Sequence, residues 1–450
     1  MKYHDIGLFL LLLAVSFGCG EKQRDASFQQ RAQELNKRIL VLDSHVDISL
    51  DYATEAVDPG VRNDSLQVDL VKMADGGVDG VFLAAYSPQG PCTGAGYENA
   101  REIAGTRIEA IRRLCGKMYP DRVGLACSPD EVIRIAGSGK RAVAIGMENG
   151  YPIGRDLSML EDYYSLGVRY VTLCHNGHND ICDSANPPNP AFPDSVPWSD
   201  PSLELLKAAS LSQLLDSPAV EAEHGGLSEF GRQVVARMNR LGMIVDLSHA
   251  GESTFWQVLE LSQAPVIASH SSCRALCDMA RNLNDEQLKA LKENGGCVQI
   301  TSVSDFVKFP AEKREALKEA LEKIGMSDFS YGEVLKLYEE KPALYDRILA
   351  AYLEEQEEIR ERFPPPDLRD FVDHIDYAVR LIGIDHVGIG SDFDGGGGIE
   401  GFNSAAGAVN VTAELLRRGY TEEDIAKLWG GNLMRVWGEV EQVAQALQAG

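Results

Sequence analysis

Seven histidine and carboxylate residues stand at or just after the ends of apolar runs that are spread over most of the chain. They are His45, Asp47, Glu148, His175, His249, His270 and Asp392. Imidazole and carboxylate ligands, without a pattern of thiolates, are typical of zinc or a similar divalent ion. A carboxylate can bridge two such ions about 3.5–4 Å apart, and the water between them then loses a proton near neutral pH and can attack a carbonyl. The set therefore predicts a two-metal site that performs hydrolysis.

The fold that would bring these residues together is indicated by eight apolar, β-branched runs. They are residues 39–45, 80–86, 142–148, 168–175, 243–249, 266–270, 296–301 and 386–392. Amphipathic, helix-like stretches such as residues 228–241 and 284–294 lie between them. Strands that alternate with helices predict a parallel sheet, and eight such units predict an α/β fold of the (β/α)8 TIM type. The carboxyl ends of all strands then open onto one face, where the seven side chains would converge.

Two long segments interrupt the alternation of strands and helices. Residues 306–369 are rich in Glu, Lys, Leu and Ala and end at three consecutive prolines, which predicts a helical insertion between the seventh and eighth strands. Residues 180–220 are rich in Pro, Asn and Ser and predict a long loop. The remainder is consistent with one metallohydrolase domain over residues 37–450.

The N-terminus is predicted to be an export signal. The apolar run of residues 6–17 is too short to span a bilayer comfortably and has the shape of a signal-peptide core. Gly18-Cys19-Gly20 then resembles a bacterial lipoprotein processing site. We expect a signal peptide at residues 1–19, lipidation of Cys19 and a polar tether over residues 20–36, which places the protein outside the cytoplasm, in the periplasm or at the cell surface, on a lipid anchor. A plain secretory signal is the alternative.

Composition excludes some classes of protein. The formal charge of -25 makes nucleic acid an unsuitable partner, because phosphate binding needs a basic face. Contents of 44% hydrophobic and 25% charged residues are those of an ordinary soluble globular protein. Besides Cys19, eight cysteines remain, and none forms a CxxC pair, so we interpret them as structural or inert with pairing left open.

The segments around the candidate ligands resemble a known family. They are Asp43-Ser-His45-Val-Asp47, Gly146-Met-Glu148-Asn-Gly150, Thr172-Leu-Cys-His175-Asn, Asp246-Leu-Ser-His249, Ser269-His270-Ser-Ser and Gly388-Ile-Gly-Ser-Asp392-Phe-Asp394-Gly. In this order, and over roughly residues 41–437, they look like the signature segments of the membrane (renal) dipeptidase family of zinc metallopeptidases. The resemblance implies a zinc-dependent dipeptidase that cleaves small dipeptides with a metal-bridging hydroxide and tolerates a D-residue at the C-terminal position.

The resemblance also implies roles for individual residues. His45 and Asp47 would hold one zinc ion, His249 and His270 a second, and Glu148 would bridge the two. Asp392 would shuttle the proton from nucleophile to leaving amine, His175 would bind the substrate beside the scissile carbonyl, and Arg281 would pair with the terminal carboxylate. Glu148, His175 and Asp392 would thus be the catalytic residues. Members of the family are often dimers, so a homodimer is expected as well.

Other readings of these residues stay open. Arg274 lies near Arg281 and could replace it, Asp43 could orient a ligand, and Asp394 could be a turn residue. The remaining histidines with structural or loop interpretations are His178, His224, His374 and His386.

The chain also departs from the animal members of the family. Ser302-Val303-Ser304 stands where they carry a substrate-contacting tyrosine, and the helical insertion is longer than theirs, which leaves substrate preference open. A related amidohydrolase acting on a β-lactam, cyclic amide or lactone is one alternative. A surface lipoprotein that binds metal or peptide without turnover is another.

Overall fold

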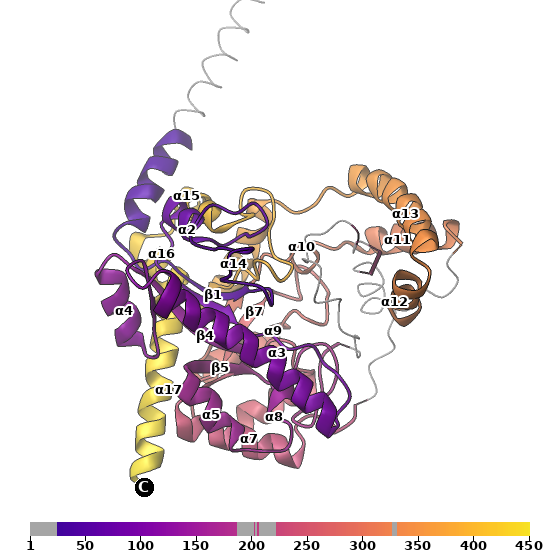
Figure 1. Cartoon of the computed structure of the whole chain (residues 1–450). Coiled ribbons are helices and arrows are strands. Elements are labelled where there is room, and N and C mark those ends of the chain that lie inside the picture. The colour runs from indigo at the N-terminus through magenta and orange to yellow at the C-terminus, as the bar shows by residue number, and fades with distance from the viewer. Residues whose placement is uncertain (1–24, 187–201, 203–204, 207–221, 326–330) are drawn as a thin grey trace, which may run out of the picture.

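A nearly closed barrel of parallel strands forms the centre of the molecule (Figure 1), whose computed structural model describes residues 25–186, 202, 205–206, 222–325 and 331–450. The strands are hydrogen-bonded in the order β1-β2-β4-β5-β6-β7-β8-β9. After β9 the chain pairs with β1, because the Asp392 N–H donates to the His45 carbonyl (3.1 Å) and the Asp47 N–H donates to the Phe393 carbonyl (2.8 Å). The predicted (β/α)8 barrel is confirmed.

All eight predicted strands are present, and their bounds position the candidate site. They are β1 (Leu42–Asp47), β2 (Gly80–Ala84), β4 (Arg141–Glu148), β5 (Val168–Thr172), β6 (Ile244–Asp246), β7 (Ile267–Ser271), β8 (Cys297–Ile300) and β9 (Val387–Ile389). His175, His249 and Asp392 each lie three residues beyond the end of a strand, so they stand on loops and not at strand ends as the apolar runs suggest. The sequence also missed β3 (Val123–Leu125), a short strand that pairs with β4 off the main path.

Helices cover the outside of the barrel (Figure 1). They are α2 (Leu70–Gly76), α3 (Gly94–Arg113), α4 (Pro129–Gly137), α5 (Met159–Leu166), α7 (Glu229–Leu241), α8 (Glu252–Leu261), α9 (Asp285–Glu293), α14 (Leu368–Ile382), α15 (Ala408–Arg418), α16 (Glu422–Ala426) and α17 (Asn432–Ala449). Their starts follow local sequence. Ser228 caps α7 by accepting from the Gly231 N–H, and Asn284 caps α9 in a capping box with Gln287.

The inner layer of the barrel supports the site. Alternate strand residues, including Phe82 on β2 and Tyr170 on β5, form an apolar cluster with Trp437 of α17. The ring of Phe82 lies 5.2 Å from those of both Tyr170 and Trp437, measured between centroids. Tyr170 is the member of this cluster that contacts His45, and the centroids of their stacked rings lie 6.3 Å apart.

The helical insertion forms a lobe beside the barrel, at the right of Figure 1. Between β8 and β9 the chain forms α10 (Ser304–Val307), α11 (Ala311–Lys323), α12 (Tyr331–Glu340) and α13 (Pro342–Arg362), and α13 ends just before the three prolines. Two small apolar clusters hold the lobe together, and one of them includes Cys277 and Met279 from the loop after β7. Most of the predicted loop over residues 180–220 lies outside the described residues.

Residues 25–36 form a helix that packs on the barrel, at the indigo start of the coloured chain in Figure 1. Ala32 and Leu35 are buried, and the Asn36 side-chain amide donates to the Gly76 carbonyl (2.9 Å). The segment assigned to a tether, residues 20–36, is therefore part of the folded domain from residue 25 on. Cys19 and the predicted signal peptide lie outside the described residues. Among the described residues, no helix has the length and apolar character needed to cross a membrane.

Candidate metal centre

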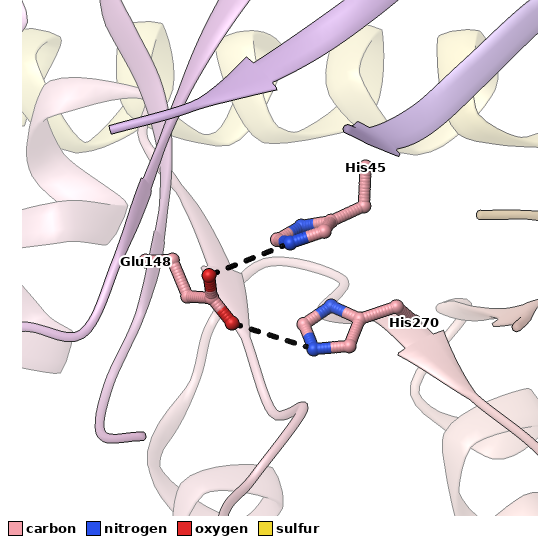
Figure 2. Close-up of side chains that lie close together, drawn as sticks. All are labelled: His45, Glu148 and His270. Carbon is pink, nitrogen blue, oxygen red and sulfur yellow. Dashed lines mark ion pairs between the residues drawn. The ribbon is translucent and has the colours of Figure 1, made fainter. Parts of the chain in front are cut away.

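All seven predicted residues meet at one end of the barrel. Figure 2 shows Glu148 between His45 and His270, with one carboxylate oxygen directed towards each imidazole. Glu148 Oε2 lies 3.6 Å from His45 Nε2, whereas Oε1 lies 3.5 Å from His270 Nε2 and 3.2 Å from His249 Nε2. The ligand atoms fall into three overlapping groups, which are His45 with Glu148 and His270, Glu148 with His175 and His249, and His45 with Asp47 and Asp392.

The fold positions these side chains through strand ends and tight turns. His45 and Asp47 are alternate residues of β1 and therefore share a side of the sheet. His249 and Asp392 adopt left-handed backbone conformations, with φ of 67° and 61°, which residues other than glycine rarely adopt. A Cβ at Gly395 would overlap the carboxylates of both Asp47 and Asp392, so this glycine leaves the room that they occupy.

The hydrogen bonds of His45 leave one ring nitrogen for a cation. Tyr170 donates its hydroxyl to the Ser44 carbonyl (3.3 Å) and lies 2.8 Å from His45 Nδ1, so His45 Nδ1–H donates to that hydroxyl. The Nε2 lone pair is then directed towards the carboxylates of Asp47 (3.6 Å) and Glu148 (3.6 Å). It is fully buried and has no hydrogen-bond partner. A buried ring nitrogen that faces two carboxylates needs a positive charge beside it. In the metal-free protein a proton can supply this charge, because Tyr170, Glu148 and Asp47 outweigh the effect of burial and raise the pKa of His45 well above its ordinary value, and a bound metal ion would replace that proton.

His270 and His249 face each other in the same way. Ser269 donates its hydroxyl to the Asp246 carboxylate (2.6 Å), so Ser269 Oγ accepts from His270 Nδ1 (2.8 Å). Asn176 Oδ1 likewise accepts from His249 Nδ1 (3.3 Å). Both Nε2 atoms are left with lone pairs only 3.0 Å apart, an unfavourable contact unless a cation lies between them. The carboxylate, hydroxyl and amide groups fix the ring orientations that a metal site needs.

The spacing of the donors fits a transition-metal ion. Two ligands at about 2.0–2.1 Å from a tetrahedral ion lie about 3.3 Å from each other. The three distances among Glu148 Oε1, His249 Nε2 and His270 Nε2 are 3.0, 3.2 and 3.5 Å. The donor atoms are imidazole nitrogens and carboxylate oxygens, with no thiolate, and zinc and similar ions bind such a set. The residues present therefore fit a divalent metal.

Burial keeps most of these imidazoles neutral. It lowers the pKa of His175 to about 3, and it lowers the pKa values of His249 and His270 well below the ordinary value. Neutral imidazoles can coordinate metal without first losing a proton. Burial also raises the pKa of Asp392 well above its usual range, and the neighbouring carboxylates of Asp47 and Glu148 raise it further. Asp392 is thus suited to carry a proton.

Arg281 is buried close to the cluster. Its exposed fraction is 3%, and one terminal nitrogen donates to the His270 carbonyl (3.3 Å). Its Nε has no hydrogen-bond partner, and burial lowers the pKa of the guanidinium to about 10. Arg274, the alternative candidate, donates instead to the Asn282 and Ala280 carbonyls of its own loop. A buried guanidinium with unused donors is a binding group for a planar anion such as a carboxylate.

The other candidates have structural partners. Asp43 accepts from the backbone of His45 and Ser391, and Asp394 accepts from the backbone of Gln67 and Val68. The other four histidines among the described residues form hydrogen bonds within the protein: His178 with Ser184, His224 with Asn179, His374 with Cys273 and Val307, and His386 with Gly296.

Sequence reasoning missed the residues that orient the ligands, chiefly Tyr170, Asn176, Asp246 and Ser269. One signal was available for Tyr170. It lies opposite Gly146 on the neighbouring strand, and a Cβ at Gly146 would overlap its ring. A glycine inside an apolar strand indicates the close approach of another group.

Comparison with known families gives one match over most of the chain. The family profile described as membrane dipeptidase (peptidase family M19) matches residues 29–198 and 208–450. The chain is 32% identical to dipeptidase aclJ of Aspergillus oryzae, over 85% of this chain and 72% of that protein. It is 30% identical to dipeptidase 3 of Mus musculus, over 94% of this chain and 68% of that protein.

Solved structures agree with the sequence matches. The probable dipeptidase PvdM from Pseudomonas aeruginosa superimposes with a TM-score of 0.76 at 34% identity, over 93% of this chain and 100% of that one. A metallo peptidase from Rhodobacter sphaeroides, solved with a phosphinate mimic of the dipeptide L-Ala-D-Ala, superimposes with a TM-score of 0.64 at 23% identity, over 89% of this chain and 99% of that one.

Proposed function

The chain belongs to the membrane dipeptidase family, peptidase family M19, and we propose that it hydrolyses dipeptides at a pair of zinc ions bridged by Glu148. Metal-dependent hydrolysis of dipeptides is its activity. The observation that carries the two-ion proposal is the orientation of Glu148, whose Oε2 faces His45 at 3.6 Å while its Oε1 faces His249 at 3.2 Å and His270 at 3.5 Å. One carboxylate directed to two sets of imidazoles has the arrangement of a bridging ligand.

The proposed ligands divide into two sets around Glu148. His45 and Asp47 from β1 would hold one ion, and His249 and His270 would hold the other. The 3.0 Å separation of the two Nε2 atoms in the second set supports this assignment. When bound, the ions would supply a water of lowered pKa and polarise the carbonyl of the substrate.

Three further side chains would act on the substrate. Asp392, whose burial raises its pKa, would take the proton from the nucleophile and deliver it to the leaving amine. His175 would donate a hydrogen bond to the developing oxyanion, and with 19% of its side chain exposed it is the most accessible of the four clustered imidazoles. Arg281 would bind the terminal carboxylate of the dipeptide through its unused donors.

A substrate panel combined with metal analysis tests this function. We expect about two equivalents of zinc per chain, hydrolysis of L-Ala-L-Ala and L-Ala-D-Ala, and loss of activity on chelation that zinc restores. Acceptance of the D-residue is proposed because the Rhodobacter sphaeroides relative binds a mimic of L-Ala-D-Ala. Hydrolysis of a carbapenem with no dipeptide turnover would favour the alternative amidohydrolase. Tight dipeptide binding without turnover in zinc-replete buffer would favour a binding protein.

We also propose that the protein is exported and anchored by a lipid on Cys19, because the apolar run of residues 6–17 leads to Gly18-Cys19-Gly20. The variant Cys19→Ser is expected to leave the membrane fraction and to lose incorporation of labelled fatty acid. Membrane attachment of that variant at the wild-type level would contradict the anchor. The homodimer expected from the family stays a prediction, which light scattering of the purified protein would test.

A further inference from the structure

The helical insertion begins against the loop that carries Arg281. Phe306 lies in α10, the first helix of the insertion, and its ring centroid is 5.5 Å from the guanidinium carbon of Arg281. This distance is within the range of a cation–π interaction. The first helix of the insertion therefore contacts the residue that we assign to the substrate carboxylate.

Few hydrogen bonds orient the guanidinium of Arg281. Among the described residues, its only hydrogen bond runs to the His270 carbonyl at 3.3 Å, and its Nε has no partner. A guanidinium is planar and carries five N–H donors in a fixed fork, so a single bond does not fix its plane. An aromatic ring against the group restricts its rotation and leaves the donors at its edge available.

Phe306 is itself held in place by the residue next to Arg281. The Asn282 side-chain amide donates to the Phe306 carbonyl and to the Cys277 carbonyl, both at 2.8 Å, and its oxygen accepts from the Ser272 N–H at 3.1 Å. Asn282 is fully buried, and its bonds to Cys277 and Ser272 are shielded from water, while its bond to Phe306 is partly buried. Loss of the Asn282 amide would therefore leave the carbonyls of Cys277 and Phe306 and the Ser272 N–H without this partner.

Two further contacts join the same parts of the chain. The ring of Phe306 packs on the apolar cluster of the lobe, which includes Met279 from the Arg281 loop and Phe309 from the insertion. His374 of α14 accepts from the Cys273 N–H (3.1 Å) and donates to the Val307 carbonyl (2.9 Å). The Arg281 loop and α10 are thus fixed to each other on several sides.

We propose that Phe306 is a positioning residue of the carboxylate subsite, because its ring holds the guanidinium of Arg281 in the orientation that receives the C-terminal carboxylate of a dipeptide. The helical insertion then contributes to substrate affinity through its first helix. The inference rests on the proposed role of Arg281. It adds a function for the helical insertion, whose first helix carries Phe306.

Phe306→Leu tests the proposal, because leucine keeps the apolar packing and removes the aromatic face. We expect KM for L-Ala-L-Ala to rise about 3- to 30-fold, the range between an exposed and a desolvated cation–π contact, with kcat within about twofold of wild type. Phe306→Tyr keeps an aromatic face and is expected to have the KM of wild type. Phe309→Leu is the matched control, since Phe309 packs in the same cluster and the nearby cation at its ring is Lys313. An equal rise of KM in the Phe309 variant would assign the effect to the lobe in general and overturn the proposal.

A double-mutant cycle with Arg281→Lys separates this inference from the function on which it depends. If Arg281 binds the carboxylate, the single variant Arg281→Lys has a raised KM. A KM equal to that of wild type in this variant would reject the proposed role of Arg281. If Phe306 acts through Arg281, Phe306→Leu has little further effect on KM in the Arg281→Lys background. Two outcomes would reject the positioning role of Phe306 and leave the role of Arg281 intact. One is additive increases of KM in the double variant, and the other is an unchanged KM in Phe306→Leu when Arg281→Lys raises KM.

Discussion

Glu148→Gln is expected to lower metal affinity at least about 100-fold and to leave no measurable dipeptide hydrolysis, since losing even a residue that only orients a ligand typically costs 10- to 100-fold. The substitution keeps the size of the side chain but removes its charge. Both Glu148 oxygens now face imidazoles at 3.2–3.6 Å. Glutamine keeps an oxygen at only one of these two positions and places an NH2 group, which cannot bind a metal ion, at the other. Metal content measured by elemental analysis after dialysis, together with dipeptide turnover, checks this result.

The same variant is expected to keep or increase the thermal stability of the metal-free protein. Burial raises the pKa of Glu148, and the Asp47 carboxylate raises it further. A carboxyl group with a raised pKa in the folded state is charged at a cost to stability at neutral pH, and that cost decreases as the pH falls. Removing the charge removes this cost. The stabilisation that wild type gains from added zinc should be absent in the variant.

Glu414→Gln is the matched control for a buried glutamate outside the metal cluster. Glu414 accepts from Arg418 Nε at 2.9 Å and also pairs with Arg417, both on α15. Its substitution should lower the melting temperature and leave metal content unchanged, which is the reverse of the pattern for Glu148. Normal metal content in Glu148→Gln would remove Glu148 from the ligand set.

The barrel and its convergent ligands could be predicted because both depend on local patterns. Each buried parallel strand is a short β-branched run, as in residues 142–148, and the connectivity of a barrel brings strand ends together whatever their separation in sequence. The Glu- and Lys-rich composition of residues 306–369 likewise predicted helices. These features need no knowledge of tertiary contacts.

The groups that orient the ligands depend on contacts between strands, and the sequence pattern does not contain them. Tyr170 and Ser269 occupy strand positions that an ordinary β-forming residue could fill, and their partners His45 and Asp246 lie on other strands. Helix 25–36 was assigned to a tether because its residues are mostly polar. Its three buried residues, Ala32, Leu35 and Asn36, acquire their role only from the surface against which they pack.

Asp392→Asn is expected to retain metal within a few-fold of wild type and to lose about 10²- to 10⁴-fold in kcat, the usual contribution of a positioned acid or base. The backbone should tolerate the change, because Asp392 has a φ of 61° and asparagine adopts this region more readily than most residues. An amide cannot carry a proton from one reactant to another, whereas the buried Asp392 carboxyl, with its raised pKa, can. Steady-state kinetics with metal analysis of the same sample measures both quantities.

Asp394→Asn distinguishes the carboxyl group of Asp392 from the loop that carries it. Asp394 has nearly the same φ, 63°, but its oxygens accept from the Gln67 N–H (2.8 Å) and the Val68 N–H (3.3 Å). An asparagine oxygen can still accept from Gln67, so the loop should keep its shape and kcat should stay near wild type. Equal losses in both variants would mean that the loop conformation limits turnover. A loss confined to Asp392→Asn would identify its carboxyl group as the proton carrier, because the two residues share a positive φ on the same loop and only Asp392 is grouped with the ligand atoms of His45 and Asp47 among the described residues.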